Sequence, residues 1–292
     1  MHNASANNLV STGNQAIAAQ DIKLLVLDID GTISGHSNTI SLRVKQAIAS
    51  AQAKGIHVAI ATGRMYRSAL RFHQDINSTL PLAAYQGAWI QDPATEQVHR
   101  HLAVSCEIAH QLLDYFEQPQ LRSLLSIHFY INDQLYVREI TPETKIYVKR
   151  SNIPVIPVGD LRQVLNTNSP TKVLALCDNT NLIDELLVDL RRQYTPSELY
   201  LTTSTPTFLE ATNASVNKGA AVLYLAEELL GLQSANVMTI GDNFNDLEML
   251  QYAGIGVAMG NAPAAVQAIA KWVAPTVEED GAAVAIEKFI LS

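Results

Sequence analysis

The sequence predicts an α/β protein with a Rossmann-like, doubly wound parallel sheet as its core and an inserted α+β domain. Short apolar runs near the N-terminus end in polar turns, and each run is followed by a segment with helical periodicity. The same alternation returns in the last third of the chain, whereas the middle pairs strands with helices without such turns. Alternating strands and helices favour a parallel sheet covered on both faces, which binds ligands at the carboxyl ends of its strands.

The length also indicates two domains, because the chain has 292 residues and a domain takes roughly 150. We expect residues 1–84 and 213–292 to form the core and residues 85–212 to form the insertion. Residues 1–20 are rich in Asn, Ser, Ala and Gln, and they are predicted to be a flexible N-terminal extension.

The first part of the core is predicted to hold two buried strands, each followed by a helix. Residues 23–27 are a continuous apolar run, as expected for a strand buried on both faces. Ser41 then caps a helix that ends at Gly55. Residues 56–61 form the second strand, and a second helix begins after Arg64. The buried face of the first helix is predicted to consist of Val44, Ala47, Ile48 and Ala51.

The remaining elements follow from the same two periodicities. In the insertion we expect helices at 105–117 and 181–193 and strands at 123–131, 134–138, 172–177, 199–203 and 207–211. In the last part of the core we expect helices at 218–230, 246–252, 264–270 and 278–290 and strands at 236–240 and 254–258.

Composition excludes several classes of protein. A net charge of −8 without any Lys/Arg run argues against a nucleic-acid partner. The two cysteines, Cys106 and Cys177, show no CxxC pattern, which argues against a disulfide framework or a zinc site. The sequence has neither a signal peptide nor an apolar run of the roughly 20 residues that a membrane span needs. We therefore expect a cytoplasmic protein with no membrane partner, either a monomer or a small homo-oligomer.

A pair of carboxylates follows the first predicted strand. Asp28 and Asp30 are two positions apart, so in a strand their side chains point the same way. One could attack phosphorus while the other moves protons, provided that a cation relieves their repulsion. Gly31 permits a sharp turn that brings a backbone N–H to a phosphate oxygen. The alternatives are a simple Asp-Gly turn and a calcium loop, but Thr39 stands where that loop requires a bidentate Glu.

Three other turns carry polar groups that suit a bound phosphate. Asp242, Asn245 and Asp246 follow a predicted strand and offer the oxygen ligands that Mg²⁺ prefers, although an Asx turn that starts a helix is the simpler reading. Thr62 ends the second strand, and Lys218 begins a helix where an anion would bind. Each is unremarkable alone, since most such lysines are solvated. Because all four turns would meet at one sheet edge, their combination indicates a phosphate site.

In this combination the sequence resembles the haloacid dehalogenase-like hydrolases. The large insertion is similar to the α/β cap of the Cof-type, class IIB branch, which is called type C2B. Two departures from the branch are Gln86, where Asn is usual, and Asn217, where Ser is commoner. The matching motifs, in chain order, are Asp28-x-Asp30-Gly31-Thr32, Thr62-Gly63-Arg64, Lys218-Gly219 and Gly241-Asp242-x-x-Asn245-Asp246.

The resemblance implies a role for each matching residue. Asp28 would be the nucleophile that forms an aspartyl-phosphate, and Asp30 would be the general acid and base. Thr62, Lys218, Gly31 and Gly63 would bind the phosphate. Mg²⁺ would be held by Asp28, the main-chain carbonyl of Asp30, Asp242 and, directly or through water, Asp246, with Asn245 in support.

The expected function is therefore a magnesium-dependent phosphatase that acts on small phosphorylated metabolites, such as sugar phosphates or similar monoesters. The alternatives are a phosphomutase with the same kind of cap, like the phosphomannomutases, and a non-catalytic metabolite-binding relative. Of the residues on expected cap strands, Phe129, Tyr130, Tyr136 and Arg138 are candidates for substrate contact, although a packed or solvated role is more common for such side chains.

Overall fold

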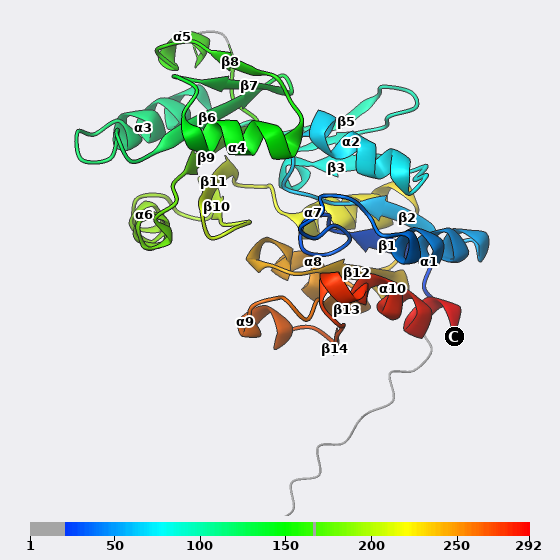
Figure 1. The fold of residues 1–292 in the computed structure, drawn as a ribbon. Helices are drawn as coiled ribbons and strands as arrows, with labels where there is room; N and C mark the ends of the chain where they lie inside the picture. The colour runs from blue at the N-terminus through cyan, green and yellow to red at the C-terminus, as the bar shows by residue number, and fades with distance from the viewer. Residues whose placement is uncertain (1–20, 166–167) are drawn as a thin grey trace, which may run out of the picture.

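The computed structural model describes residues 21–165 and 168–292, and the extension expected at residues 1–20 lies outside them. In these ranges the chain forms two lobes, each built on its own large sheet (Figure 1). No helix in the described part of the chain is long and apolar enough to cross a membrane.

The core lobe contains the predicted parallel sheet. Among the described residues it has five strands in the order β14-β13-β12-β1-β2, and every neighbouring pair is parallel. The doubly wound core is thus confirmed. Its strands are β1 (Leu24–Leu27), β2 (His57–Ile60), β12 (Val237–Gly241), β13 (Ile255–Ala258) and β14 (Trp272–Val273).

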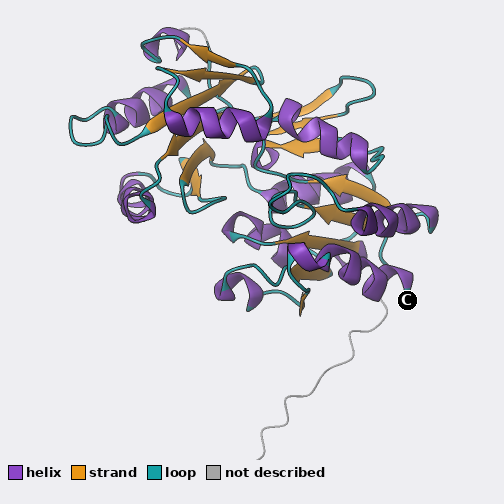
Figure 2. Ribbon diagram, viewed as in Figure 1, coloured by secondary structure: helices purple, strands orange, loops and turns teal. Residues whose placement is uncertain are grey.

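Helices cover both faces of this sheet, which explains why β1 is apolar throughout (Figure 2). Leu25 and Leu27 face α1 (Leu42–Ala53) and α10 (Gly281–Ile286), whereas Leu24 and Val26 pack with α7 (Lys218–Leu223) on the other side. Alternate residues of one strand therefore serve two separate hydrophobic clusters. The other core helices are α2 (Tyr66–Asp75), α8 (Leu247–Tyr252) and α9 (Ala264–Gln267).

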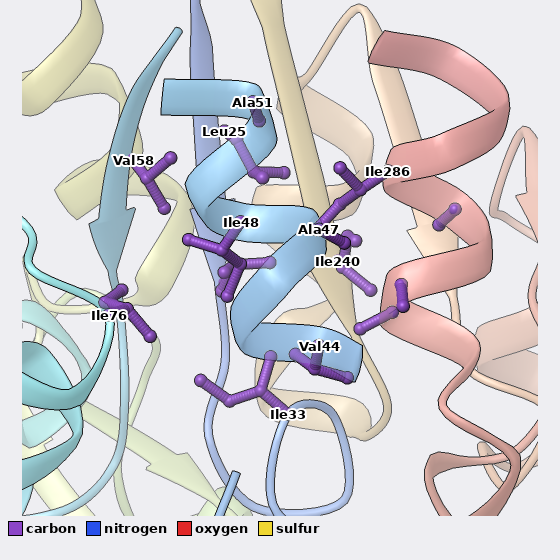
Figure 3. Packing of buried hydrophobic residues seen from close by; sticks show 14 of the residues in the cluster. Leu25, Ile33, Val44, Ala47, Ile48, Ala51, Val58, Ile76, Ile240 and Ile286 are labelled. Carbon is purple, nitrogen blue, oxygen red and sulfur yellow. The ribbon is translucent and has the colours of Figure 1, made fainter. Parts of the chain in front are cut away.

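The helix α1 matches its sequence prediction closely. The Ser41 side chain accepts a hydrogen bond from the Val44 amide at 3.2 Å, and Gly55 follows the helix with φ of 84°. Figure 3 shows its buried face against the sheet and α10, with Val44, Ala47, Ile48 and Ala51 pointing inward as expected.

The second lobe, which we call the cap, is built on an antiparallel-rich sheet. In the described ranges it has six strands in the order β10-β11-β9-β6-β7-β8. Helices α3 (Cys106–Phe116) and α6 (Thr180–Gln193) share one hydrophobic cluster with it, and α4 (Pro142–Ser151) packs with another. The strands are β6 (Ser126–Ile131), β7 (Gln134–Val137), β8 (Val155–Pro157), β9 (Lys172–Leu176), β10 (Leu199–Thr202) and β11 (Phe208–Asn213).

A small third sheet was not anticipated from the sequence. It consists of β3 (Leu82–Ala84), β4 (Trp89–Gln91) and β5 (Val98–His101), and His99 on β5 bonds to Tyr224, which follows α7 in the core. Residues 89–101 therefore pair with β3 rather than with the cap sheet. The expected boundary at residue 85 stays a prediction.

Several expected boundaries were wrong. The strand expected from residue 123 begins at Ser126, because residues 119–124 form turns. The helix expected at 218–230 is α-helical only to Leu223 and continues as a π-helix over Tyr224–Leu229. The last helix begins at Gly281 and ends in a π-helix, Glu287–Leu291. Helices α4 and α5 (Arg162–Leu165) were missed.

The two connections between the lobes lie beside each other. The Asn213 side chain, at the end of β11, donates a hydrogen bond of 3.0 Å to the carbonyl of Ala103, just before α3. The chain thus enters and leaves the cap at nearly the same place.

Candidate active site

A cavity of about 280 Å³ lies between the two lobes, and both contribute to its lining. Asp28, Thr62 and Asp242 line it from the core, while Arg150 of α4 and Lys172 of β9 line it from the cap. Asp28 follows β1, Asp242 follows β12 and Thr62 follows β2. Because these strands are parallel neighbours, their carboxyl ends meet at one sheet edge, as the sequence led us to expect.

Lys218 lies behind Asp28, which lines the cavity from the core. Its ammonium lies 2.6 Å from Asp28 Oδ1 and 2.5 Å from Asp246 Oδ1, and its side chain is fully buried. Burial alone would lower the pKa of Lys218, but the charges of Asp246 and Asp28 outweigh it and raise that pKa. Asn217 replaces the commoner Ser as the cap of α7, accepting a bond of 2.7 Å from the Ala220 amide.

Asp246 is held by protein groups on both of its oxygens. Oδ1 pairs with Lys218, and Oδ2 accepts hydrogen bonds from the amides of Asp242 and Asn243 at 2.7 and 3.0 Å. Gly241 permits this approach, since a Cβ there would lie 2.5 Å from the Asp246 carboxyl carbon. The geometry favours a positioning role, and metal binding by Asp246 stays a prediction.

The carboxylates of this site suit a divalent cation. Ligand oxygens of Asp28, Asp242 and Asp246 all lie within 4.8 Å of one another. Burial and the neighbouring carboxylate charges raise the pKa of Asp28 to about 7 and that of Asp242 to about 9. Three acids with one lysine leave uncompensated negative charge, and an all-oxygen donor set suits a hard cation such as Mg²⁺.

Asp242 is oriented toward this position by two donors. The Thr32 hydroxyl donates to Oδ1 and the Asn261 amide to Oδ2, both at 3.2 Å. Asn261 also donates to the carbonyl of Gly31 at 2.9 Å. Gly31 has φ of 78°, and a Cβ at this residue would overlap the Asp242 carboxylate. The glycine is therefore needed for close approach of the two loops.

Asp30 makes contacts that sequence reasoning did not predict. Its carboxylate accepts two hydrogen bonds from Arg64 and one from Arg150, each 2.7 Å long. Burial alone would raise the pKa of Asp30, but hydrogen bonds and charge from Arg64, followed by Arg150, lower it to about 2. In this arrangement Asp30 is ionised, whereas a proton donor must hold a proton.

Thr62 and Gly63 lie at the cavity as expected. Thr62 is buried, its hydroxyl oxygen accepts a bond of 3.2 Å from the Arg64 amide, and its O–H remains a donor for an oxyanion. Gly63 gives room to a neighbour, because a Cβ there would lie 2.5 Å from the Gln86 amide nitrogen.

Gln86 connects the core loop that carries Asn245 to the cap. Its side-chain oxygen accepts a bond of 3.1 Å from Asn245, and its amide donates to Glu210 of β11 at 3.2 Å. Asn245 thus orients Gln86 in this structure. Tyr85, Gln86 and Gly87 have φ of 51°, 62° and 94°, so all three have positive φ. This conformation is unfavourable for Tyr85 and Gln86, because both carry a Cβ.

The four cap residues singled out from the sequence do not line the cavity. Phe129 and Tyr130 are fully buried in the cap, Tyr136 donates to Gln134, and Arg138 pairs with Glu139. The packed or solvated interpretation was the better one.

Several of the cap side chains that do line the cavity come from α4, a helix that the sequence analysis missed. The signal was present: Thr141 caps the helix, Pro142 stands in its first turn, and Asn152 ends it in the left-handed conformation. Its buried residues, Thr144 and Ser151, are polar, so the apolar periodicity of an ordinary surface helix is lacking.

Comparisons with known proteins agree with this geometry. A family described as haloacid dehalogenase-like hydrolase matches residues 25–286. The Bacillus subtilis protein YcsE, a 5-amino-6-(5-phospho-D-ribitylamino)uracil phosphatase, is 30% identical over 93% of this chain and 97% of its own. YitU of the same organism, named for the same activity, is 29% identical over 89% and 94%. The subclass IIB sugar phosphatase BT4131 superposes with a TM-score of 0.79 at 25% identity, over 91% and 98% of the two chains.

Proposed function

The chain belongs to the haloacid dehalogenase-like hydrolases and is a phosphatase, and from this premise we propose that it hydrolyses small phosphorylated metabolites through an aspartyl-phosphate on Asp28, with Mg²⁺ as its cofactor. The observation that carries the proposal is the position of the Asp28 carboxylate. It lies on the cavity wall, 2.6 Å from Lys218 and within 4.8 Å of Asp242.

In the proposed reaction Asp28 attacks the phosphorus, and the bond from phosphorus to the ester oxygen breaks. Lys218 and Thr62 hold the non-bridging oxygens, and their effect is greatest as charge accumulates there in the transition state. Water then hydrolyses the aspartyl-phosphate, which releases inorganic phosphate and restores the Asp28 carboxylate.

Mg²⁺, when bound, would supply positive charge for the phosphate oxygens and relieve the repulsion among the acids. Asp28 and Asp242 are the residues that we assign to hold it, together with the predicted main-chain carbonyl of Asp30. Asp246 fixes Lys218 and the loop that carries Asp242.

Asp30 is the proposed general acid, which protonates the leaving oxygen and later deprotonates water. With a pKa of about 2 it cannot donate a proton at neutral pH. Substrate binding must therefore loosen its contacts with Arg64 and Arg150 and add the negative charge of the phosphate, which raises the pKa. Arg150 belongs to the cap, so cap movement would change this balance.

The substrate class is supported by the similar proteins. BT4131 is described as a sugar phosphatase, and YcsE and YitU are named for a ribitylaminouracil phosphate. The substrates in these names are small phosphate monoesters. The cavity volume of about 280 Å³ agrees with a ligand of that size.

The test is phosphate release from a panel of monoesters, with Mg²⁺ and with a chelator, followed by mass spectrometry of the rapidly quenched protein. We expect metal-dependent release without any added bisphosphate and a phosphorylated peptide that contains Asp28. Equal release after chelation would contradict the metal, an intermediate on another residue would contradict the nucleophile, and a requirement for a bisphosphate would favour a mutase.

A further inference from the structure

One face of α4 is turned toward the cavity. Glu143, Ile146, Tyr147 and Arg150 all line it, and their spacing of three, four and seven residues places them on a single helical face. Ile146 is 67% exposed although it is a large apolar residue. The helix thus presents apolar side chains to the cavity, while Tyr147 also packs against a hydrophobic cluster.

The cap sheet supplies the rest of an apolar wall, which we define as Ile146, Tyr147, Leu176 and Phe208. The rings of Tyr147 and Phe208 have centroids 5.9 Å apart and are tilted by 57°. Both rings are only partly buried, and Leu176 and Phe208 line the cavity from β9 and β11. The wall is continuous with the site of Asp28, because the same cavity contains both.

Several polar side chains beside this wall are engaged with one another. Lys172 donates to the Gly63 carbonyl at 2.8 Å and pairs with Glu210 at 3.1 Å. Glu210 also accepts hydrogen bonds from Gln86 and Ser204. The hydroxyls of Thr205 and Thr207 lie 3.3 Å apart. These groups gain little from the hydroxyls of a bare sugar, because binding one would require breaking bonds already made.

On the basis of the proposed function, we propose that the preferred substrate is a phosphate monoester whose organic part carries a planar aromatic or heteroaromatic ring, which packs against the apolar wall formed by Ile146, Tyr147, Leu176 and Phe208. A flat ring buries much apolar area on such a wall and gains from contacts with the tilted rings of Tyr147 and Phe208. A short polyol phosphate leaves the wall exposed to water.

The first arm of the experiment compares phosphate release from matched substrates by the Mg²⁺-loaded full chain. The ring-bearing set is uridine 5′-monophosphate, pyridoxal 5′-phosphate and flavin mononucleotide, and the ring-free set is ribose 5-phosphate, glycerol 3-phosphate and ribitol 5-phosphate. We expect kcat/KM for the best ring-bearing substrate to exceed that of every ring-free one by about tenfold or more.

The second arm compares Tyr147→Leu with Tyr136→Leu, a matched control on the cap outside the cavity lining. Tyr147→Leu is expected to reduce the ratio of ring-bearing to ring-free kcat/KM by about tenfold, mainly through KM. Tyr136→Leu should leave the ratio unchanged. Ile146→Asp provides a second variant at an exposed position where folding is not at risk, and it should reduce the ratio in the same direction.

Two results would overturn the inference: a ring-free substrate that equals or exceeds all ring-bearing ones, or variants at Tyr147 and Ile146 that leave the ratio unchanged. Either result leaves the proposed function intact as long as phosphate is released. Failure to release phosphate from any substrate in the presence of Mg²⁺ would instead contradict the proposed function.

Discussion

Lys218 in the core and Lys172 in the cap are both buried lysines, and their surroundings differ in charge. Lys172 lines the cavity, whereas Lys218 pairs with Asp28, which lines it. Lys218 lies between Asp28 and Asp246, with Asp242 close by. Lys172 has one carboxylate partner, Glu210, one main-chain carbonyl and the face of Tyr130 at 4.9 Å.

The difference indicates which cluster has its charges balanced by the protein alone. Lys172 and Glu210 neutralise each other and have hydrogen-bond partners, so the protein alone satisfies them. The cluster around Lys218 has three carboxyl groups and one ammonium group, so it needs a further cation or bound protons to be neutral. In this molecule uncompensated buried charge marks the proposed site of chemistry, whereas a neutral buried pair connects the cap to the core.

Asp28→Asn is expected to have the largest effect, a loss of phosphate release of at least about a thousandfold. The free energy of unfolding should not fall, because the substitution removes one charge from an over-acidic cluster and leaves Lys218 paired with Asp246. Phosphate release and urea unfolding measure the two effects. The exposed Asp184 provides the control, Asp184→Asn, which should change neither. A large loss of stability without loss of turnover would invalidate the comparison.

Glu210→Gln is expected to act in the opposite way, mainly on stability. It leaves the Lys172 charge buried without a counter-ion, which should lower the free energy of unfolding by about 3–5 kcal/mol. The double variant Lys172→Met/Glu210→Gln should recover most of this loss, since it removes the unpaired charge. Denaturant unfolding of the single and double variants checks this. A Glu210→Gln variant as stable as the wild type would show that the ion pair between Lys172 and Glu210 does not contribute to the free energy of unfolding.

The third prediction is that Mg²⁺ stabilises the protein through the cluster around Lys218 and not through the Lys172–Glu210 pair. At about 100 times its dissociation constant, the ion is expected to add about 2.7 kcal/mol to the free energy of unfolding. Asp242→Asn should abolish most of this gain, whereas the double variant at Lys172 and Glu210 should retain it. Thermal unfolding with and without Mg²⁺ measures the gain. Equal gains in the two variants would place the ion elsewhere.

The metal-free protein should lose stability as pH rises. The folded pKa values of about 7 for Asp28 and about 9 for Asp242 lie above the unfolded value of about 3.9, so the folded state binds more protons. The contribution of these protonated groups to the free energy of unfolding is complete below about pH 4. It falls as pH rises to about 9, by up to about 1.4 kcal/mol per pH unit for each group. Mg²⁺ should flatten this dependence, and Asp242→Asn should remove its upper part. Unfolding measured from pH 4 to 9 tests both, and a stability that rises over this range would be inconsistent with raised pKa values.

The core and the placement of its site could be predicted because the relevant signals are local. Each apolar run predicts a buried strand, each following turn lies at a carboxyl end, and parallel pairing then brings Asp28, Thr62 and Asp242 together. Their spacing in the chain does not matter once the strands are placed.

Other features depend on contacts between distant segments and could not be predicted in this way. The pairing of Arg150 with Asp30 joins residues 120 positions apart, and no local pattern indicates it. The helix α4 lacks the usual apolar stripe because its buried residues, Thr144 and Ser151, are polar, and its apolar Ile146 lines a cavity. Gln86 was recognised as a departure from the branch, but its bond to Asn245 required the fold.

The bond between Asn213 and Ala103 has a consequence for how such proteins diversify. Because the insertion begins and ends at neighbouring points, its replacement by another segment of any length would leave the ends of the parallel sheet where they are. The loops to which we assign the reaction and the cap, which we propose selects the substrate, can then change independently, and a new specificity can arise by recombination without altering the proposed catalytic residues.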